Sequence, residues 1–222
     1  MVTRKLGPAL AAGCTVVLKT AGETPFTATA LVALAEKAGV PSGVINVINA
    51  LNSTPAIGEA LCASSIVRKV SFTGSTRVGR ILMKQSSDSI KKLSLELGGN
   101  APCIVFNDAD LDAAIRDVVI TKFKSSGQAC VCSNRIYVHN DVYEEFLNKL
   151  TAIVQSFKVG PGLDPSTTHG PLINSAAVNK VAQIVDDAVS KGARVVVGGK
   201  KLLELGKFLF RFMHMLIFEC TN

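Results

Sequence analysis

The amino-acid sequence predicts an α/β protein assembled from parallel βαβ units. Short runs of β-branched residues alternate with longer helical segments along most of the chain, and glycine or proline separates them. At 48% apolar and 18% charged residues, the 222-residue chain can bury a hydrophobic core. Fibrous and disordered classes are thereby excluded.

The first half of the chain carries three such alternations. They begin at residue 13, because Gly7 and Pro8 interrupt the apolar stretch that precedes it. Thr24-Pro25 predicts a helix start, since threonine is a good N-cap and proline suits the first helical position, and Gly39 predicts the end of that helix. The predicted strands are 15–18, 44–48, 69–72 and 91–97, and the predicted helices are 26–38, 54–63 and 75–85.

Gly98-Gly99 breaks the pattern and predicts a domain boundary, with domains at 1–98 and 99–200. Residues 201–222 form a divergent tail whose apolar run fits neither a helical nor a strand period. Charged residues in that run argue against a membrane-spanning helix. The second half has predicted strands at 103–106, 135–138 and 194–197, and predicted helices at 110–124, 143–157 and 176–191.

The charge pattern argues against nucleic acid as a partner. The net charge of +7 comes from scattered lysines and arginines, nowhere denser than a pair, and the chain has 2 Tyr and no Trp for stacking on bases. The 6 cysteines have neither disulfide-scaffold nor zinc-site spacing, which predicts free thiols, a reducing compartment and no metal. An anionic small molecule is the better match.

A glycine turn between a predicted strand and helix offers a place for a phosphate. Phe-Thr-Gly-Ser-Thr-Arg-Val-Gly at 72–79 sets backbone N–H groups at a helix N-terminus, where they suit an anion. The spacing is not that of the dinucleotide fingerprint G-x-G-x-x-G. An ordinary strand-to-helix turn therefore stays open as the alternative.

Two further residues are candidates for catalysis. Cys130, in Gly127-Gln-Ala-Cys, would be a nucleophile if it is accessible and its pKa is lowered; otherwise it is a small buried hydrophobe. Glu96 stands in an apolar strand before two glycines, where burial would raise its pKa toward the range of a general base. The alternative is an edge-strand glutamate that points to water.

Taken together and in order, three motifs resemble those of the aldehyde dehydrogenase superfamily. They are Phe-Thr-Gly-Ser-Thr-x-x-Gly at 72–79, Leu-Glu-Leu-Gly-Gly-Asn-Ala-Pro at 95–102 and Gly-Gln-x-Cys at 127–130. The resemblance covers roughly residues 1–200. It implies an aldehyde dehydrogenase-like fold, with a partial Rossmann-type cofactor domain followed by a partial α/β catalytic domain.

The resemblance also implies roles for individual residues. Cys130 would attack the aldehyde and carry a thioester, and Glu96 would activate the water that releases the acid. NAD or NADP would be the cofactor, with Lys19 on the adenosine ribose and the turn at Gly74 on the pyrophosphate. The full set of expected cofactor residues is Lys19, Thr20, Ala21, Gly22, Gly74, Ser75, Thr76 and Gly79.

Within the superfamily, Met-Val-Thr-Arg-Lys-Leu-Gly at 1–7 and Cys-Val-Cys-Ser-Asn at 130–134 are most similar to succinate-semialdehyde dehydrogenases. In that subgroup Arg4 would bind the carboxylate of the substrate. A second arginine of the subgroup is Lys124 here, which keeps the charge but loses the bidentate fork. Cys132 would be the redox partner of Cys130, although a ring closed by such near neighbours is strained.

The sequence also departs from the family. Gly22 stands where members usually have a glutamate, a change that would relax the choice between NAD and NADP. Family members are around twice this length and homo-oligomeric, so we expect an incomplete gene model or a truncated product, either of which lacks the oligomerisation strand.

The expected function is oxidation of succinate semialdehyde or a similar short semialdehyde, with this chain impaired or inactive alone. The alternatives are a dehydrogenase for another chain length and a catalytically dead product that binds cofactor or full-length subunits. No membrane partner is expected. We expect an intracellular location, mitochondrial or cytoplasmic, with any targeting peptide upstream of this chain.

Overall fold

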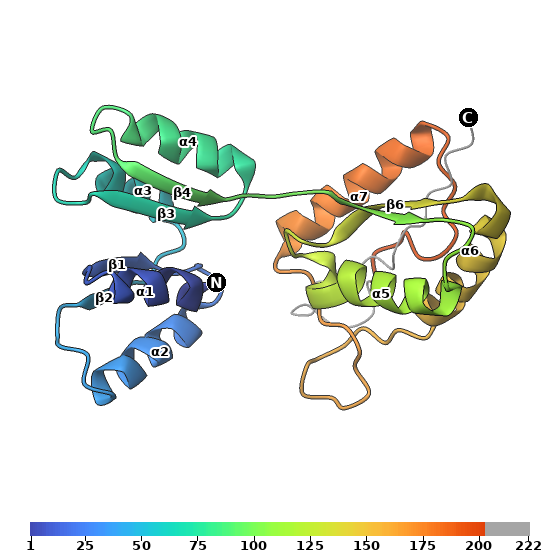
Figure 1. The fold of residues 1–222 in the computed structure, drawn as a ribbon, viewed down its shortest axis with the longest axis horizontal. Helices are drawn as coiled ribbons and strands as arrows, with labels where there is room; N and C mark the ends of the chain where they lie inside the picture. Colours follow the sequence, from blue (N-terminus) through green and yellow to red (C-terminus); the bar gives the residue numbers. More distant parts are fainter. Residues whose placement is uncertain (203–222) are drawn as a thin grey trace. The chain divides into compact units, whose positions relative to one another are not determined.

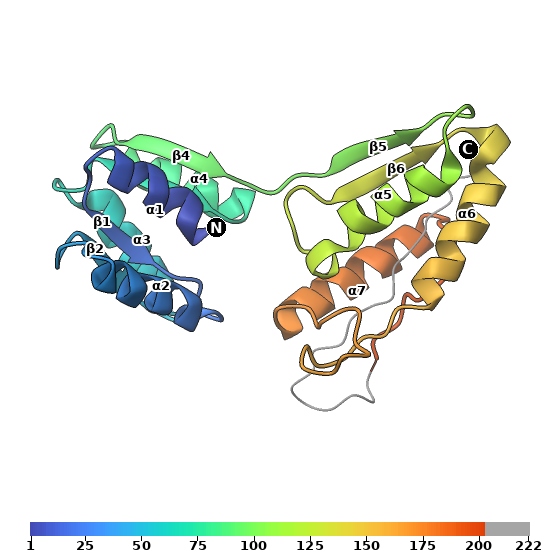
Figure 2. The same ribbon diagram turned by 60° about the horizontal axis from the view of Figure 1, so that its bottom comes forward.

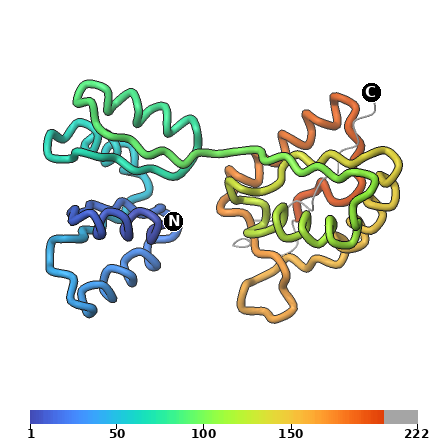
Figure 3. The backbone as a smooth tube through the Cα atoms, in the orientation of Figure 1, coloured from blue at the N-terminus to red at the C-terminus, as the bar shows by residue number. Residues whose placement is uncertain are grey.

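The computed structural model describes residues 1–202, and the expected tail at 201–222 lies almost wholly outside them. The chain divides into two compact units, Met1–Gly98 and Gly99–Asn222, shown as ribbons in Figure 1 and as a backbone tube in Figure 3. Within the described residues, no helix is both long and apolar enough to cross a membrane. The mixed α/β class predicted from the sequence is confirmed.

The first unit consists of two parallel strand pairs with helices beside them (Figure 1). Val16 is in register with Ile45 in one pair, and Lys69 with Lys92 in the other. Parallel strands need a crossover, and helices supply it here. The elements are α1 (Val2–Ala11), β1 (Val16–Lys19), α2 (Pro25–Lys37), β2 (Ile45–Ile48), α3 (Thr54–Ala63), β3 (Lys69–Thr73), α4 (Thr76–Ser86) and β4 (Lys92–Glu96).

The core of the β1–β2 half takes one buried residue from each of four elements. They are Leu6 of α1, Leu18 of β1, Ala28 of α2 and Ile45 of β2. Helix α1 was not expected, because Pro8 lies inside it and lacks the N–H of a normal helical residue. The burial of Leu6 against the strand pair gives α1 a tertiary partner, which overrides its poor local sequence.

The second unit is a parallel pair with helices packed beside it (Figure 2). Its core includes Val105, Val118, Phe146 and Leu150, each at most 3% exposed. The elements are β5 (Ala101–Val105), α5 (Leu111–Phe123), a 3₁₀ turn (Lys124–Gly127), β6 (Ser133–Val138), α6 (Asn140–Gln155) and α7 (Ser175–Ser190).

The strand predicted at 194–197 is wrong: these residues have no regular secondary structure. Among the described residues no strand pairs with them, and an apolar run without a ladder partner does not become a strand. Val197 packs against the core cluster of the second unit instead.

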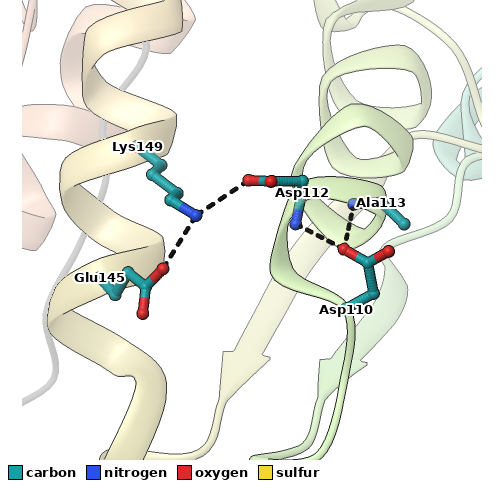
Figure 4. Close-up of polar contacts among 5 residues, drawn as sticks. All are labelled: Asp110, Asp112, Ala113, Glu145 and Lys149. Carbon is teal, nitrogen blue, oxygen red and sulfur yellow. Dashed lines mark hydrogen bonds and ion pairs between the residues drawn. The ribbon is translucent and has the colours of Figure 1, made fainter.

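Charged groups at the start of α5 connect it to α6 (Figure 4). Asp110 caps α5, its Oδ1 accepting from the backbone N–H of Asp112 at 3.0 Å and of Ala113 at 3.1 Å. Nζ of Lys149 in α6 lies 2.9 Å from Oδ1 of Asp112 and 2.8 Å from Oε1 of Glu145. This pairing lowers the pKa of the Asp112 carboxyl and raises that of Lys149.

Replacing Asp110 by alanine is expected to destabilise the chain by about 0.5–2 kcal/mol, because two orphan N–H groups of α5 lose their acceptor. Asp110→Asn keeps a capping oxygen and serves as the matched control. Urea unfolding followed by circular dichroism measures the difference. Equal stability of the alanine and asparagine variants would contradict the capping role.

Candidate functional site

The predicted phosphate turn and Glu96 lie at the same edge of the β3–β4 pair. Thr73, the last residue of β3, is opposite Glu96, the last of β4, and the N–H of Gly74 donates to the carbonyl of Glu96 at 3.1 Å. Ser75 caps α4, its Oγ accepting from the N–H of Val78 at 3.3 Å. Parallel pairing therefore brings two motifs together that are about twenty residues apart.

Two glycines of this motif lie against neighbouring side chains. A Cβ at Gly79 would lie 2.7 Å from Cδ2 of Leu97, and one at Gly74 would run into the ring of Phe72. Gly74, Ser75 and Thr76 are exposed, and the first turn of α4 has no acidic residue. The turn thus fits an anion, such as the pyrophosphate of a dinucleotide.

Glu96 is exposed at the end of its strand, and the burial on which its expected pKa rise depended is not found. The Glu96 carboxylate interacts with Lys5, whose pKa is lowered by burial while Glu96 acts to raise it. Lys5 of α1 also donates to Oγ of Ser71 at 3.0 Å. Sequence reasoning missed Lys5, because its partners lie far along the chain. Its neighbour Arg4 is exposed.

The residues expected at the adenosine ribose follow strand β1. Lys19 is the half-buried last residue of β1, and buried Thr20 donates from Oγ1 to Oδ1 of Asn49 at 2.8 Å. Ala21 is exposed and Gly22 is half-buried. These residues lie at the carboxyl edge of the β1–β2 pair, the edge at which open α/β sheets bind ligands.

At Gly22 there is no room for a side chain. A Cβ there would lie 2.5 Å from Cδ1 of Leu51 and 2.9 Å from its Cα, so the backbone of the turn after β2 occupies the space as well as the leucine side chain. The φ angle of Gly22 is not in the left-handed region, so close approach is the constraint. A glutamate at this position would need that turn to move.

Cys130 stands on an irregular loop between α5 and β6. The loop begins with Ser125, Ser126 and Gly127, all with positive φ of 50–74°. Cys130 is exposed, as the nucleophile interpretation requires. The alternative, a small buried hydrophobe, would require burial instead. A Cβ at Gly99 would come within 3.1 Å of the Cys130 carbonyl oxygen, so the loop approaches the chain before β5 closely.

Cys132, by contrast, is fully buried, and its thiol donates to the Lys124 carbonyl at 3.9 Å. Both cysteines are free thiols. Their redox pairing therefore stays a prediction.

Gln128 of the Gly-Gln-x-Cys motif ties this loop to a later segment. Its Nε2 donates to the Ser125 carbonyl at 3.2 Å, and its Oε1 accepts from the N–H of Ile173 at 2.9 Å. Ser126 donates to the Gly170 carbonyl at 2.8 Å. The glutamine thus has a positioning role in the fold, which the motif by itself does not reveal.

Lys124 is exposed and borders an open cleft of about 410 Å³. His169 also lines the cleft, its ring centroid lies 4.2 Å from that of Phe157, and burial lowers the pKa of this histidine. The remaining lining residues are Val119, Ile120, Phe123, Ser125, Ser126, Thr168 and Gly170. Cys130 does not line the cleft.

The candidate site residues thus fall into three groups. The first unit contains the group around β1–β2 and the group at Gly74, Glu96 and Lys5. The second unit contains the group of Lys124, Cys130 and Cys132. Among the described residues, no cluster of metal-ligating side chains occurs.

Residues 1–217 match the sequence model of the aldehyde dehydrogenase family. The chain belongs to that family. The match extends beyond residue 200, where the resemblance was expected to end.

Relatives with a known name include a succinate-semialdehyde dehydrogenase [NADP(+)] of Schizosaccharomyces pombe, 59% identical over 95% of this chain and 42% of its own length. A glutarate-semialdehyde dehydrogenase of Pseudomonas putida is 56% identical over 90% of this chain and 41% of its own length. The crystal structure of succinate-semialdehyde dehydrogenase from Burkholderia pseudomallei superposes with a TM-score of 0.93 at 51% identity, covering 100% of this chain and 45% of that one. The chain thus spans less than half the length of the relatives that it matches.

Gly22→Ala is expected to cost this aldehyde dehydrogenase chain about 1–3 kcal/mol, because the new methyl group overpacks against the backbone of residue 51. Gly58→Ala is the matched control: its Cβ would meet Leu82 at an ordinary 3.5 Å. Since Gly58 lies inside helix α3, alanine there should stabilise by roughly 0.5–1 kcal/mol. Denaturant unfolding distinguishes the two, and a neutral Gly22→Ala would show that the turn moves freely.

The stability of the chain is expected to fall as the pH drops through the ordinary histidine pKa of 6.5. Because the pKa of His169 is lowered in the folded state, the unfolded state binds the proton more readily in that range, and protonation favours unfolding. Melting temperatures measured from pH 8 to pH 5 should fall less steeply in His169→Gln than in the unchanged chain. Equal slopes in both proteins would contradict this role of His169.

Proposed function

We propose that this chain carries the nucleophile, the base and cofactor contacts of an NAD(P)-dependent dehydrogenase that oxidises succinate semialdehyde or a similar short semialdehyde. The main support is the exposure of Cys130 on a loop held by Gln128, in a chain 59% identical to a succinate-semialdehyde dehydrogenase. An exposed thiol on a fixed loop is what a carbonyl nucleophile needs.

In the proposed reaction, Cys130 attacks the aldehyde carbon as a thiolate, so that a C–S bond forms and the carbonyl π electrons move onto oxygen. A nicotinamide cofactor held at the Gly74 turn and Lys19 would supply the oxidising power as the acceptor of hydride from that carbon, and the C=O bond of the thioester re-forms as the hydride leaves. Glu96 then takes a proton from water as the water attacks the thioester, which frees the acid and the Cys130 thiol. Lys5 is half-buried and within electrostatic range of the Glu96 carboxylate, which acts to raise the pKa of Lys5 against the larger lowering by burial.

The cofactor contacts proposed in the first unit fit a dinucleotide. The exposed Gly74–Ser75 turn at the start of α4 would bind the pyrophosphate, and Lys19 at the end of β1 the adenosine ribose. Because Leu51 and its backbone keep position 22 free of a carboxylate, nothing at that position would repel a 2′-phosphate. This favours use of NADP as the cofactor, and several relatives are named as NADP(+)-dependent succinate-semialdehyde dehydrogenases.

Substrate selection is assigned to two cations, Arg4 and Lys124. A short semialdehyde carries a carboxylate at its far end, which a cation would bind. Lysine offers a point charge rather than a planar fork and so constrains the carboxylate less than arginine would. The glutarate-semialdehyde dehydrogenase among the relatives favours a second candidate substrate, one carbon longer.

Purified 222-residue chain is expected to oxidise succinate semialdehyde with formation of NADPH at an impaired rate, and Cys130→Ala should abolish this turnover because the thioester cannot form. Absorbance of NADPH and NADH, with succinate and glutarate semialdehyde compared at equal concentration, measures rate and preference. Cys14→Ala, at another exposed cysteine, is the matched control and should leave the rate unchanged. Absence of turnover from demonstrably folded chain would contradict an active site in this chain and favour a binding role.

A further inference from the structure

Strand β6 has an irregularity next to the nucleophile loop. Ala101 of β5 is opposite Ser133, but Pro102 is opposite Arg135, so Asn134 is an extra residue in the ladder. Such β-bulges re-aim a side chain and are frequent beside active sites. Proline, which lacks a backbone N–H, is tolerated at bulges, and Pro102 lies here.

The side chain of Asn134 uses both ends of its amide. Its Oδ1 accepts from Nζ of Lys122 at 2.6 Å. Its Nδ2 donates to the Gly99 carbonyl at 3.3 Å and to Oδ1 of Asn100 at 3.1 Å. One side chain therefore joins the last turn of α5, the start of β6 and the segment that leads into β5.

A second hydrogen bond between α5 and β6 lies beside the one from Lys122 to Asn134. Ser133 donates from Oγ to Oγ1 of Thr121 at 3.1 Å, so the consecutive pairs Thr121–Ser133 and Lys122–Asn134 connect the two ends of the loop. The loop between them contains Cys130. Gly99, which accepts from Asn134, is also the residue that the Cys130 carbonyl approaches.

Lys122 is half-buried, and its pKa is lowered by that burial while the neighbouring Cys132 acts to raise it. None of the salt bridges found in residues 1–202 involves Lys122. A partly buried ammonium that relies on a neutral acceptor costs desolvation energy without a carboxylate in return. An apolar residue would avoid that cost, which suggests that the bond and the charge serve the loop.

We infer that Lys122 and Asn134 are positioning residues that hold the nucleophile loop closed at its base and thereby present Cys130 to its substrate. This inference rests on the proposed role of Cys130 as the nucleophile. Neither residue touches the reacting atoms. Each acts through the loop that Lys122 and Asn134 close together, and loss of either should have the same effect.

The test measures how fast iodoacetamide alkylates Cys130 in the folded 222-residue chain, with exposed Cys14 as the internal reference, by mass spectrometry of peptides. Cys130 is expected to react faster than Cys14 in the unchanged chain. Lys122→Met and Asn134→Ala should each lower the Cys130-to-Cys14 rate ratio several-fold, because the loop that presents the Cys130 thiol is no longer held at its base. Lys180→Met, at an exposed lysine of α7, is the matched control and should leave the ratio unchanged.

Two further variants separate the contributions. Lys122→Arg keeps the charge and a donor and should restore most of the ratio, whereas Lys122→Gln keeps only a donor and should restore less. Hydrogen exchange of peptides covering 124–132 should be faster in Lys122→Met and Asn134→Ala, with peptides of α6 unchanged. The comparison of Lys122→Arg with Lys122→Gln also provides an answer if Lys122→Met fails to fold.

An unchanged ratio in folded Lys122→Met and Asn134→Ala overturns the inference while the proposed function stands. A fall in melting temperature with no change in the Cys130-to-Cys14 ratio also overturns the inference, because the bond between Lys122 and Asn134 then contributes to stability alone. If Cys130 of the unchanged chain reacts no faster than Cys14, the proposed nucleophile is wrong, and the inference fails with it.

Discussion

Parallel pairing between distant segments is the constraint on which the candidate site depends. In the first unit it aligns the ends of β3 and β4, so that the Gly74 turn and Glu96 share a hydrogen bond. It places Lys19 at the corresponding edge of β1–β2. These are carboxyl edges, where parallel sheets ordinarily bind ligands. The nucleophile loop is different, since it precedes β6 and lies at the amino end of its strand.

Because Cys130 does not follow a strand, other contacts have to hold it in place. Gln128 and Ser126 anchor the loop to the later segment at Gly170 and Ile173. At the base of the loop, Asn134 is the extra residue of β6 and has no partner in the β5–β6 ladder. Its side chain forms hydrogen bonds instead. The loop thus depends on specific hydrogen bonds more than on regular structure, and a single substitution can disturb it.

Close approach by neighbouring residues bears on three glycines of the first unit. Gly74 and Gly79 make room for Phe72 and Leu97, and Gly22 faces the backbone of Leu51. At Gly22 the consequence is chemical as well as steric, because the same contact excludes a carboxylate from the ribose end of the proposed cofactor site. Packing in this chain therefore bears directly on which cofactor is proposed.

Much of the local structure could be predicted from the sequence. Helix α3 was predicted at its observed residues, and strand and helix alternate from β1 to β4 and from β5 to α6, because period and capping are properties of neighbouring residues. The motifs identified Cys130, Glu96 and the Gly74 turn as candidates, and the family that they indicated is confirmed. Helix α1 was missed and the strand at 194–197 was wrong, since the first has a tertiary partner for Leu6 and the second has no strand to pair with.

The contacts that give these residues their surroundings were decided only by the tertiary structure. Lys5 meets Ser71, and Asn134 meets both Gly99 and Lys122, across separations at which sequence has no periodic signal. Exposure of Glu96 and complete burial of Cys132 likewise depend on which elements pack beside each strand. Residue type and spacing determine which chemistry is available in this chain. Burial and long-range hydrogen bonds determine which side chains are placed to perform it, because desolvation and close approach exist only once the chain has folded.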